Sequence, residues 1–317
     1  MVKPAPGIEK LTPRDSAAWH ALRGRDVTAS VAGALFGLHP YVTRYGLWAR
    51  KTGRMPASDM DSENEAMRRG RLLEPVAVAL LRERHPDWRI THTGERNVYY
   101  RDPAARIGAT PDVVATAPGR GRGVVQIKSV EAGVYAREWA PGGAEPEAPE
   151  WIMLQASIEA HLIGARWAVV APLVVSHTLE LPLIEVPLMP EVIDAVKAAV
   201  AEFWRMVDAG EQPDPDFDRD GPTIDALYAQ GDDDYATDLT GDPDIPALID
   251  RRADAARRKR EAEAEIAEID ARVKAAMGEA TSAHIGGGRR IAWRNRAKPG
   301  HYVPPSNFRV LTYPRSG

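Results

Sequence analysis

Two short apolar segments joined by a turn constrain this chain most, because together they predict a β-hairpin. Valines follow Asp112 in the first segment, a Gly/Arg-rich turn spans residues 118–123, and the second segment ends in Gln126-Ile127-Lys128. Turn residues between two β-branched runs are typical of a hairpin. Because side chains alternate along a strand, Gln126 and Lys128 share one face of the sheet, while Asp112 begins the neighbouring strand.

This hairpin allows two interpretations. An acid, a second oxygen ligand and an amine on one sheet face are what metal-assisted phosphodiester cleavage requires. The oxygens hold a hard divalent cation, and the amine steadies the attacking hydroxide or the phosphate charge. The alternative is an edge hairpin whose polar side chains simply face water.

Two helices that carry further polar side chains flank the hairpin. Upstream, Glu74 lies in the first turn of a helix that begins near Gly70 and has apolar neighbours on its inward stripe. Downstream, residues 151–160 predict an amphipathic helix in which Gln155 lies one turn from Trp151 and one turn from Glu159. The polar residues therefore follow the order Glu helix, Asp strand, Gln-x-Lys strand, Gln helix.

The wider pattern predicts an α/β fold, a mixed central β-sheet flanked by helices. A helical segment at about 13–54 comes first, and a helix from Pro190 to about Asp208 closes the core, which we expect to span residues 1–210. Strands are expected at about 96–101, 105–109, 112–116, 123–128, 166–175 and 178–187.

Beyond this core the composition changes. Residues 211–244 predict an acidic linker rich in Pro and Asp, and residues 245–317 predict a long charged helix followed by a basic C-terminal segment. The helix has an apolar stripe and the (i, i+4) pairs Glu268–Arg272 and Asp270–Lys274. After a triple glycine, the alternation in residues 289–296 predicts a strand. This strand belongs either to a flap that contacts DNA or a partner, or to a small β cap on the long helix.

Composition excludes several classes of protein. There is no cysteine, which rules out a disulfide scaffold and a structural cysteine–zinc site. There is no apolar run near 18 residues, no secretory leader pattern and no Walker loop, so we expect a soluble intracellular protein that works without ATP.

The net charge of −4 is unevenly distributed along the chain. Residues 1–71 hold 12 Lys/Arg against 7 Asp/Glu, and residues 286–317 hold 7 Lys/Arg and no acid. Residues 203–250, in contrast, hold 14 acids and 2 arginines. Two basic regions around an acidic one can form a local phosphate track while the whole chain stays acidic.

The order of polar residues resembles the core of the PD-(D/E)xK nucleases, and in detail the lambda-exonuclease and YqaJ-type viral recombinase family. The resemblance extends from about Trp19 to about Lys298. Its most specific part is N-terminal, Trp19-His20-Ala21-Leu22-Arg23 followed by Val27-Thr28-Ala29-Ser30. It implies a restriction-endonuclease-like core in which Arg23 and Ser30 hold a 5′-terminal phosphate. Asp102 matches an acid beside the metal site of the family.

One departure from the family bears on activity. The family usually has Glu where this chain has Gln126, which keeps a carbonyl oxygen but loses a negative charge. Fewer anionic ligands weaken the binding of hard cations. Either Gln126 coordinates through its amide oxygen while Glu74 and Asp112 supply the charge, or the site is inactive. We expect activity, since Glu74, Asp112 and Lys128 are all retained.

The resemblance implies a role for each residue. Asp112, Gln126 and the Ile127 carbonyl would bind Mg²⁺ or Mn²⁺, with Glu74 binding directly or through water. Lys128 would orient or deprotonate the attacking water, and Gln155 would position the scissile strand. The expected function is a deoxyribonuclease that degrades one strand of linear duplex DNA from a 5′-phosphorylated end.

The resemblance also implies a setting for this activity. The product, a 3′ single strand, would pass to a single-strand annealing protein during phage-type recombination in the cytoplasm of a bacterial host, and the enzyme would be a homo-oligomer. Two rival classes remain, a nuclease-dead protein that binds DNA ends and an endonuclease with the same core.

Overall fold

The computed structural model describes residues 5–55, 64–231 and 236–295, apart from the side chain of Arg96. The chain divides into two units, Met1–Leu227 and Tyr228–Gly317. Among the described residues, no helix combines the length and apolar character that crossing a bilayer would need.

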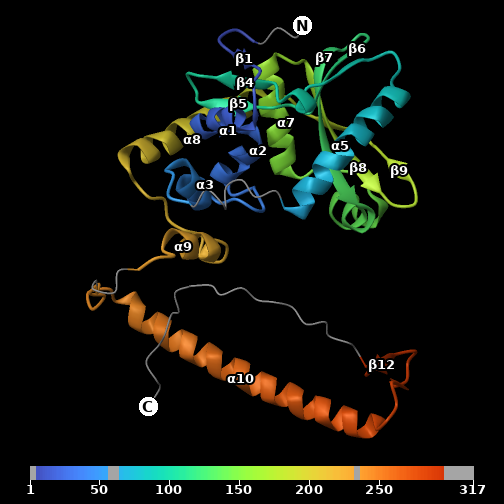
Figure 1. Ribbon diagram of the computed structural model, residues 1–317, viewed down its shortest axis with the longest axis vertical. Coiled ribbons are helices and arrows are strands. Elements are labelled where there is room, and N and C mark those ends of the chain that lie inside the picture. Colours follow the sequence, from blue (N-terminus) through green and yellow to red (C-terminus); the bar gives the residue numbers. More distant parts are fainter. Residues whose placement is uncertain (1–4, 56–63, 232–235, 296–317) are drawn as a thin grey trace. The chain divides into compact units, whose positions relative to one another are not determined.

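The first unit contains two sheets (Figure 1). A four-stranded sheet has the order β1 (Glu9–Leu11), β4 (Tyr99–Asp102), β5 (Ile107–Ala109) and β2 (Val27–Thr28). The larger sheet has the order β10 (Ile184–Val186), β8 (Trp167–Val175), β7 (Gly121–Glu131), β6 (Val113–Ala117) and β3 (Arg89–His92), with β9 (Leu179–Glu180) paired to β8. Within the described ranges, the pairs β7–β8 and β2–β5 are parallel and the other strand pairs are antiparallel.

The predicted hairpin is present as β6 and β7, which pair antiparallel with Val113 opposite Val125. The mixed α/β fold is also confirmed, but the strands do not form one sheet. The chain leaves β5 through Thr110 and Pro111 before β6 begins, and Pro111 has no backbone N–H to extend a ladder. As a result β4 and β5 pair with each other in the smaller sheet, while β6 joins the larger one.

Helices cover both faces of the larger sheet. On one face α5 (Glu65–Arg84) packs Ala77, Val78 and Leu81 against Val125 and Ile127 of β7. On the other face α7 (Glu150–Ile163) packs against β-strand residues that include Val124 and Val130, and α8 (Pro190–Ala209) packs against α7. Val124 and Val130 alternate in phase with Gln126 and Lys128, so these two polar side chains face α7.

Local sequence signals set the helix ends. The side chains of Asp15, Thr43 and Asn64 cap α1 (Ser16–Arg25), α3 (Arg44–Lys51) and α5 by accepting backbone N–H bonds at 2.8 Å. Gly164 and Gly210 end α7 and α8 with positive φ angles of 63° and 70°, a conformation that glycine adopts without strain. Between α1 and α3 lie β2, α2 (Ala29–Ala32) and the 3₁₀ turn η1 (Gly33–Phe36).

Four short turns link the strands and helices around the larger sheet. Residues Gly94–Arg96 form the turn η2 between β3 and β4, and α6 (Ala132–Val134), η3 (Tyr135–Trp139) and η4 (Pro141–Gly143) connect β7 to α7. Trp139 is buried in the same cluster as α7, so this connection packs onto the core.

The first unit continues past the core boundary expected at residue 210. Asp220, just before α9 (Gly221–Leu227), is buried and accepts a 2.5 Å hydrogen bond from the Thr43 hydroxyl. Arg219 donates to the backbone carbonyl of His39 at 2.5 Å. Residues 216–227 therefore pack on α3 instead of forming part of a linker, because a buried carboxylate and an arginine anchor them.

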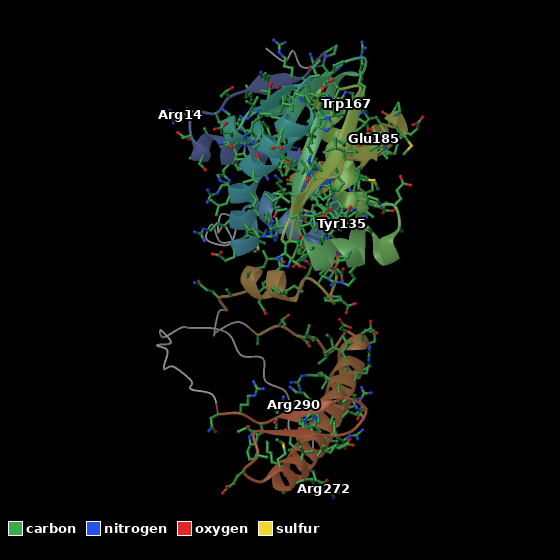
Figure 2. The ribbon with its side chains drawn as sticks, turned by 90° about the vertical axis from the view of Figure 1, so that its right-hand side faces the viewer. Arg14, Tyr135, Trp167, Glu185, Arg272 and Arg290 are labelled. Atoms are coloured by element: carbon green, nitrogen blue, oxygen red, sulfur yellow. The ribbon has the colours of Figure 1, made fainter. Side chains whose placement is uncertain are left out.

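The second unit consists of a long helix and a hairpin. Helix α10 (Asp244–Met277) has the predicted Glu268–Arg272 and Asp270–Lys274 pairs, with N–O distances of 2.5 and 3.8 Å. Strands β11 (Ser282–His284) and β12 (Arg290–Ala292) pair antiparallel, and Figure 2 labels Arg272 on the helix and Arg290 on the hairpin. The predicted strand at 289–296 is thus shorter than expected, and its last residue lies outside the described ranges.

Candidate functional site

Asp112 lies just before β6, and hydrogen bonds from β7 and from the turn after β3 fix its position. Its backbone carbonyl accepts hydrogen bonds from the N–H groups of Thr93 at 2.9 Å and Gly94 at 3.1 Å. Its side-chain Oδ2 accepts a hydrogen bond from the backbone N–H of Ile127 at 2.8 Å. The neighbouring strand β7 and the turn after β3 therefore set both the position and the direction of this carboxylate.

A chain of hydrogen bonds runs along the face of β7 that α7 covers. Nζ of Lys128 donates to Oε1 of Gln155 at 3.0 Å, and Nε2 of Gln155 donates to Oε1 of Gln126 at 2.9 Å. Nε2 of Gln126 then donates to Oδ2 of Asp112 at 2.5 Å and to the Ile127 carbonyl at 3.2 Å. An ammonium group only donates, so Lys128 sets the direction of both amides. The nitrogen of Gln126 consequently faces Asp112.

Glu159, one turn beyond Gln155 on α7, is a buried member of this cluster that sequence reasoning left without a role. Its Oε1 accepts a hydrogen bond from Nε2 of Gln155 at 2.9 Å, and its Oε2 has no partner among the described residues. Burial, and then the negative charge of Asp112, raise the pKa of Glu159 well above that of an exposed carboxyl group. The (i, i+4) spacing on a helix was the signal that placed it beside Gln155.

Glu74 reaches the same region from α5. Its Oε1 lies 2.6 Å from Nε2 of His92, which is on β3, a strand missing from the sequence prediction. The β-branched pair Ile90-Thr91 was the available signal for that strand. Gly94 makes room for the carboxylate, because a Cβ there would lie 2.5 Å from Oε1 of Glu74 and 3.5 Å from Cα of Asp112.

The surroundings of Asp112 change the pKa of its carboxyl group. Burial raises the pKa of Asp112 to about 7, and the charge of Glu74 adds to this increase. The ammonium of Lys128 and the N–H of Ile127 act in the opposite direction. The negative charge of Glu74 near Asp112 also favours a cation between or beside the two carboxylates.

The oxygens of this cluster fit a hard divalent cation. Oδ2 of Asp112 and the carbonyl oxygen of Ile127 both accept hydrogen bonds from Nε2 of Gln126, so both oxygens point to the position of that nitrogen. Oε2 of Glu159 is a buried oxygen without a partner among the described residues. Among the described residues no three His, Cys, Asp or Glu side chains form a metal site by themselves. Asp112, Ile127 and Glu74 would therefore need water ligands as well. Gln126 would join through Oε1 only if its amide turned over.

The second predicted site, at Arg23 and Ser30, is also assembled. Nη2 of Arg23 lies 3.4 Å from Oγ of Ser30, and its guanidinium lies over the Trp19 ring at 4.3 Å. The indole N–H of Trp19 donates a 3.0 Å hydrogen bond to the hydroxyl of Thr110, which lies two residues before Asp112 in the chain. Burial lowers the pKa of Arg23, and no carboxylate in the described ranges forms an ion pair with it. Such a cation favours an anionic ligand.

A buried network holds the segment that carries Arg23. Asp26, fully buried, accepts hydrogen bonds from the Tyr99 hydroxyl at 3.0 Å and from Arg101 at 2.9 and 3.0 Å. Nζ of Lys51 donates to the backbone carbonyls of Arg23 and Asp26, both at 2.6 Å. The end of α1 is therefore tied to α3 and to β4, which keeps Arg23 in place.

Asp102, which the resemblance places beside the metal site, forms its hydrogen bonds within its own turn. It ends β4 in the smaller sheet, and its Oδ1 accepts hydrogen bonds from the N–H groups of Ala104 and Ala105, both at 3.0 Å. Burial lowers the pKa of the His161 imidazole overall, although the charge of Asp102 acts to raise it. Asp102 therefore caps the turn between β4 and β5, a role that sequence spacing did not reveal because the two strands belong to the other sheet.

Comparison with known protein families places this site in context. The sequence model of the YqaJ-like viral recombinase domain matches residues 18–165. This part of the chain is therefore similar in sequence to a YqaJ-like viral recombinase domain. The domain contains both predicted clusters, the one around Asp112 and the one around Arg23, whereas α8 and α9 lie beyond it.

Solved structures that match this chain in part include exonucleases. An alkaline exonuclease from Laribacter hongkongensis shares 18% identity, with 62% of this chain and 94% of that chain covered and a TM-score of 0.49. The same enzyme in complex with dAMP shares 19% identity with the same coverage and a TM-score of 0.48. A putative exonuclease from Eubacterium rectale shares 12% identity over 73% of this chain and 98% of that chain, with a TM-score of 0.41. A search of curated proteins finds no match.

Proposed function

We propose that the protein is a Mg²⁺-dependent deoxyribonuclease that degrades one strand of linear duplex DNA from a 5′-phosphorylated end. The observation that carries this proposal is the hydrogen-bonded series Lys128, Gln155, Gln126 and Asp112, with Glu74 beside it. It brings carboxylate, amide and backbone oxygens and one amine together around β7. The similarity of residues 18–165 to the YqaJ-like family supports the same activity.

The residues would divide the chemistry among them. A divalent cation, when bound, supplies positive charge to the scissile phosphate and to its nucleophile. Asp112, the Ile127 carbonyl and Glu74 would hold this cation. Lys128 would orient the attacking water and stabilise the negative charge that develops on the phosphate. Gln155 holds the Lys128 ammonium at 3.0 Å, so it would keep the amine pointed at the reacting group.

The cluster around Arg23 would supply the preference for an end. Arg23 and the Ser30 hydroxyl lie within 3.4 Å of each other, and together they offer a charge-assisted contact and a neutral donor to a terminal phosphate. Compared with a terminal phosphate monoester, an internal phosphodiester carries one fewer negative charge, and its second ester bond leaves one fewer free oxygen for Arg23 and Ser30 to contact. This difference would favour 5′-phosphorylated ends over internal positions.

The biological setting forms part of the same proposal. A 3′ single strand is the product that a single-strand annealing protein needs, so such a protein is the expected partner in recombination. The proposed place of action is the cytoplasm of a bacterial host, and the proposed assembly is a homo-oligomer around the duplex.

One assay tests the central claim. End-labelled linear duplex DNA and covalently closed circular DNA are each incubated with the protein in three separate reactions, which contain Mg²⁺, Mn²⁺ or EDTA. The proposal predicts release of labelled nucleotide from linear DNA in either metal, no release in EDTA, and intact circles. Cleavage of the circles would show an endonuclease with the same core.

A nuclease-dead protein that binds DNA ends is the second candidate. It is favoured by the amide nitrogen of Gln126, which points to Asp112 and the Ile127 carbonyl where a cation would need an oxygen. Binding of 5′-phosphorylated ends with no hydrolysis in either metal would support this candidate and reject the enzyme.

A further inference from the structure

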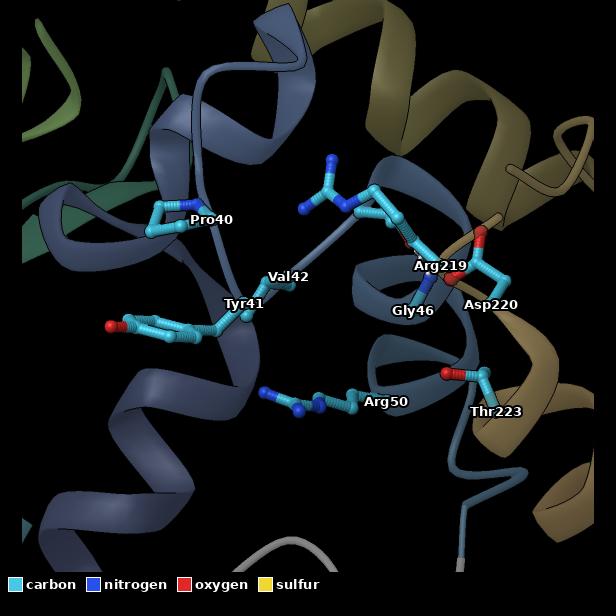
Figure 3. Close-up of a pocket in the computed structure, with 9 residues that line it drawn as sticks. Pro40, Tyr41, Val42, Gly46, Arg50, Arg219, Asp220 and Thr223 are labelled. Atoms are coloured by element: carbon cyan, nitrogen blue, oxygen red, sulfur yellow. Dashed lines mark hydrogen bonds between the residues drawn. The ribbon is translucent and has the colours of Figure 1, made fainter. Parts of the chain in front are cut away.

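A pocket between α3 and the segment that leads into α9 has no part in the proposed chemistry. It has a volume of about 240 Å³, and its polar lining includes Tyr41, Thr43, Arg50, Arg219 and Thr223. Arg50 and Arg219 both line the pocket, and Figure 3 shows Arg50 extending toward Tyr41 while the guanidinium of Arg219 lies on the other side of the segment that carries Val42. The Arg219 side of the pocket lies outside the YqaJ-like domain match, which ends at residue 165.

The two arginines provide positive charge in different ways. Arg219 is held in place, because its guanidinium donates to the His39 carbonyl at 2.5 Å and lies 3.7 Å from Asp216. Arg50 is exposed and forms no hydrogen bond or ion pair with another residue of the described ranges. One arginine is thus preorganised and the other is available to a ligand.

The acid in the lining, Asp220, does not cancel this charge. It is buried, its Oδ1 accepts a hydrogen bond from the Thr43 hydroxyl at 2.5 Å, and its Oδ2 accepts one from the backbone N–H of Asp216 at 2.8 Å. Both carboxylate oxygens are directed into the protein. The pocket therefore presents two guanidinium groups and hydroxyl groups to a ligand.

Two packed aromatic rings, His39 next to the pocket and Trp151 next to Lys128, lie between the pocket and the candidate active site. The ring of His39 packs against that of Trp151 with centroids 4.9 Å apart, and Nζ of Lys128 lies 5.2 Å from the centre of the Trp151 ring. Burial lowers the pKa of His39 to about 4, and the charges of Lys128, Arg219 and Arg50 contribute to this decrease. The positive charges of the pocket arginines and of Lys128 therefore both act at His39.

The size of the pocket indicates what it holds. Pockets that enclose whole small molecules have volumes of about 300–1,000 Å³. This pocket is smaller, and it suits one group of a larger ligand. The planar guanidinium of an arginine matches the geometry of a phosphate. Tyr41 is 83% exposed, so its ring is free to stack on a flat ligand at the rim.

We propose that this pocket binds a backbone phosphate of the DNA substrate next to the one that is cleaved, with Tyr41 stacking on the adjacent unpaired base. This inference rests on the proposed nuclease function. In this arrangement Arg50 closes on the phosphate from the solvent side while Arg219 stays fixed. The pocket would keep the strand in register as each nucleotide is removed.

The test compares Arg50→Gln and Tyr41→Ala with a matched control. Arg120→Gln is the control because Arg120 lies in the hairpin turn, at the opposite end of β6 from Asp112, where its guanidinium pairs with exposed Glu185 and lies over the Trp167 ring. Binding of a 5′-phosphorylated duplex with a single-stranded tail is measured in EDTA by fluorescence anisotropy over a range of salt concentrations. Hydrolysis in Mg²⁺ and thermal unfolding midpoints are measured in parallel.

Arg50→Gln is expected to weaken binding roughly tenfold and to reduce the salt slope of the binding constant by about one. Tyr41→Ala should weaken binding by roughly the same factor without changing the salt slope, because stacking involves no phosphate charge. Arg120→Gln should match the wild type in both respects.

Two outcomes would overturn the inference in different ways. If the wild type binds and cleaves DNA but Arg50→Gln keeps the wild-type salt slope and affinity, the pocket is not a phosphate site and the proposed function stands. If the wild type neither binds nor cleaves DNA, the proposed function fails, and the pocket proposal fails with it.

Discussion

The amide nitrogen of Gln126 donates a 2.5 Å hydrogen bond to Oδ2 of Asp112. The same nitrogen donates to the Ile127 carbonyl, so it lies where a cation would lie between these two oxygens. This arrangement satisfies a buried carboxylate without a metal, since an N–H donor replaces positive charge. It also makes residue 126 the position that best separates an active from an inactive site.

Gln126→Glu should tighten Mg²⁺ binding, because a carboxylate oxygen replaces the N–H donor beside Asp112 and Glu74. Without metal the variant should be less stable than the wild type, since it adds negative charge to a buried cluster. The increase in thermal midpoint on adding Mg²⁺ should therefore be larger for the variant. Equal Mg²⁺-induced shifts in the two proteins would show that residue 126 does not face the metal.

Gln126→Leu is the matched substitution that removes both the amide oxygen and the nitrogen. If Gln126 serves the active site, hydrolysis by this variant should fall to background. If it cleaves as fast as the wild type, Gln126 is not a ligand, and the metal site consists of Asp112, Glu74 and the Ile127 carbonyl.

Lys128→Ala should reduce strand hydrolysis by roughly 10²–10⁴-fold while leaving duplex affinity nearly unchanged, since the amine acts on the nucleophile and not on the DNA track. Single-turnover rates and anisotropy binding on the same duplex measure the two effects separately. A variant with near-normal turnover would refute the assignment of Lys128 as a catalytic residue.

Arg23→Ala should slow digestion of 5′-phosphorylated ends roughly tenfold and leave 5′-hydroxyl ends almost unaffected, because the lost contact is charge-assisted and needs the terminal phosphate. Initial rates on two otherwise identical duplexes give the ratio. Equal slowing on both substrates would point to a general backbone contact.

Gly94→Ala should impair metal binding while the fold is retained. The new Cβ would lie 2.5 Å from Oε1 of Glu74. We expect the flexible side chain of Glu74 to move away, because it can shift more easily than the backbone around residue 94. The half-saturating Mg²⁺ concentration for hydrolysis should rise. Gly70→Ala is the control, since a Cβ there meets nothing within 4 Å. An unchanged metal requirement in Gly94→Ala would exclude Glu74 from the metal site.

The contribution of Lys51 to stability should increase as pH rises. Burial is the main cause that lowers the pKa of Lys51 to about 8, from 10.5. Between pH 8 and 10.5 the unfolded chain binds more protons at this residue, so the free energy of unfolding rises with pH in that window, by roughly 2 kcal/mol. Below pH 8 the cost of burying the charge is constant.

Urea unfolding of the wild type and of Lys51→Met at pH 7.5 and pH 10.5 isolates this effect from other titrating groups. The wild type should gain stability relative to the variant at the higher pH. A difference between the two proteins that is the same at both pH values would contradict a depressed pKa at Lys51.

Local signals in the sequence were sufficient for the elements that carry the site. Alternation in β7 placed Gln126 and Lys128 on one face, and the structure shows both joined to Gln155. The turn residues between β6 and β7 predicted their antiparallel pairing. These features depend on neighbours within a few residues, so backbone geometry alone decides them.

Sequence alone therefore determined the mixed α/β fold, the hairpin and the order of polar residues, because periodicity and turn chemistry act locally. Only the tertiary structure decided the rest. Asp102 belongs to another sheet, His92 and Gly94 arrange Glu74, and Lys128 dictates which atom of Gln126 faces Asp112. Each of these depends on packing between segments far apart in the chain, and a hydrogen-bond direction depends on every member of its network.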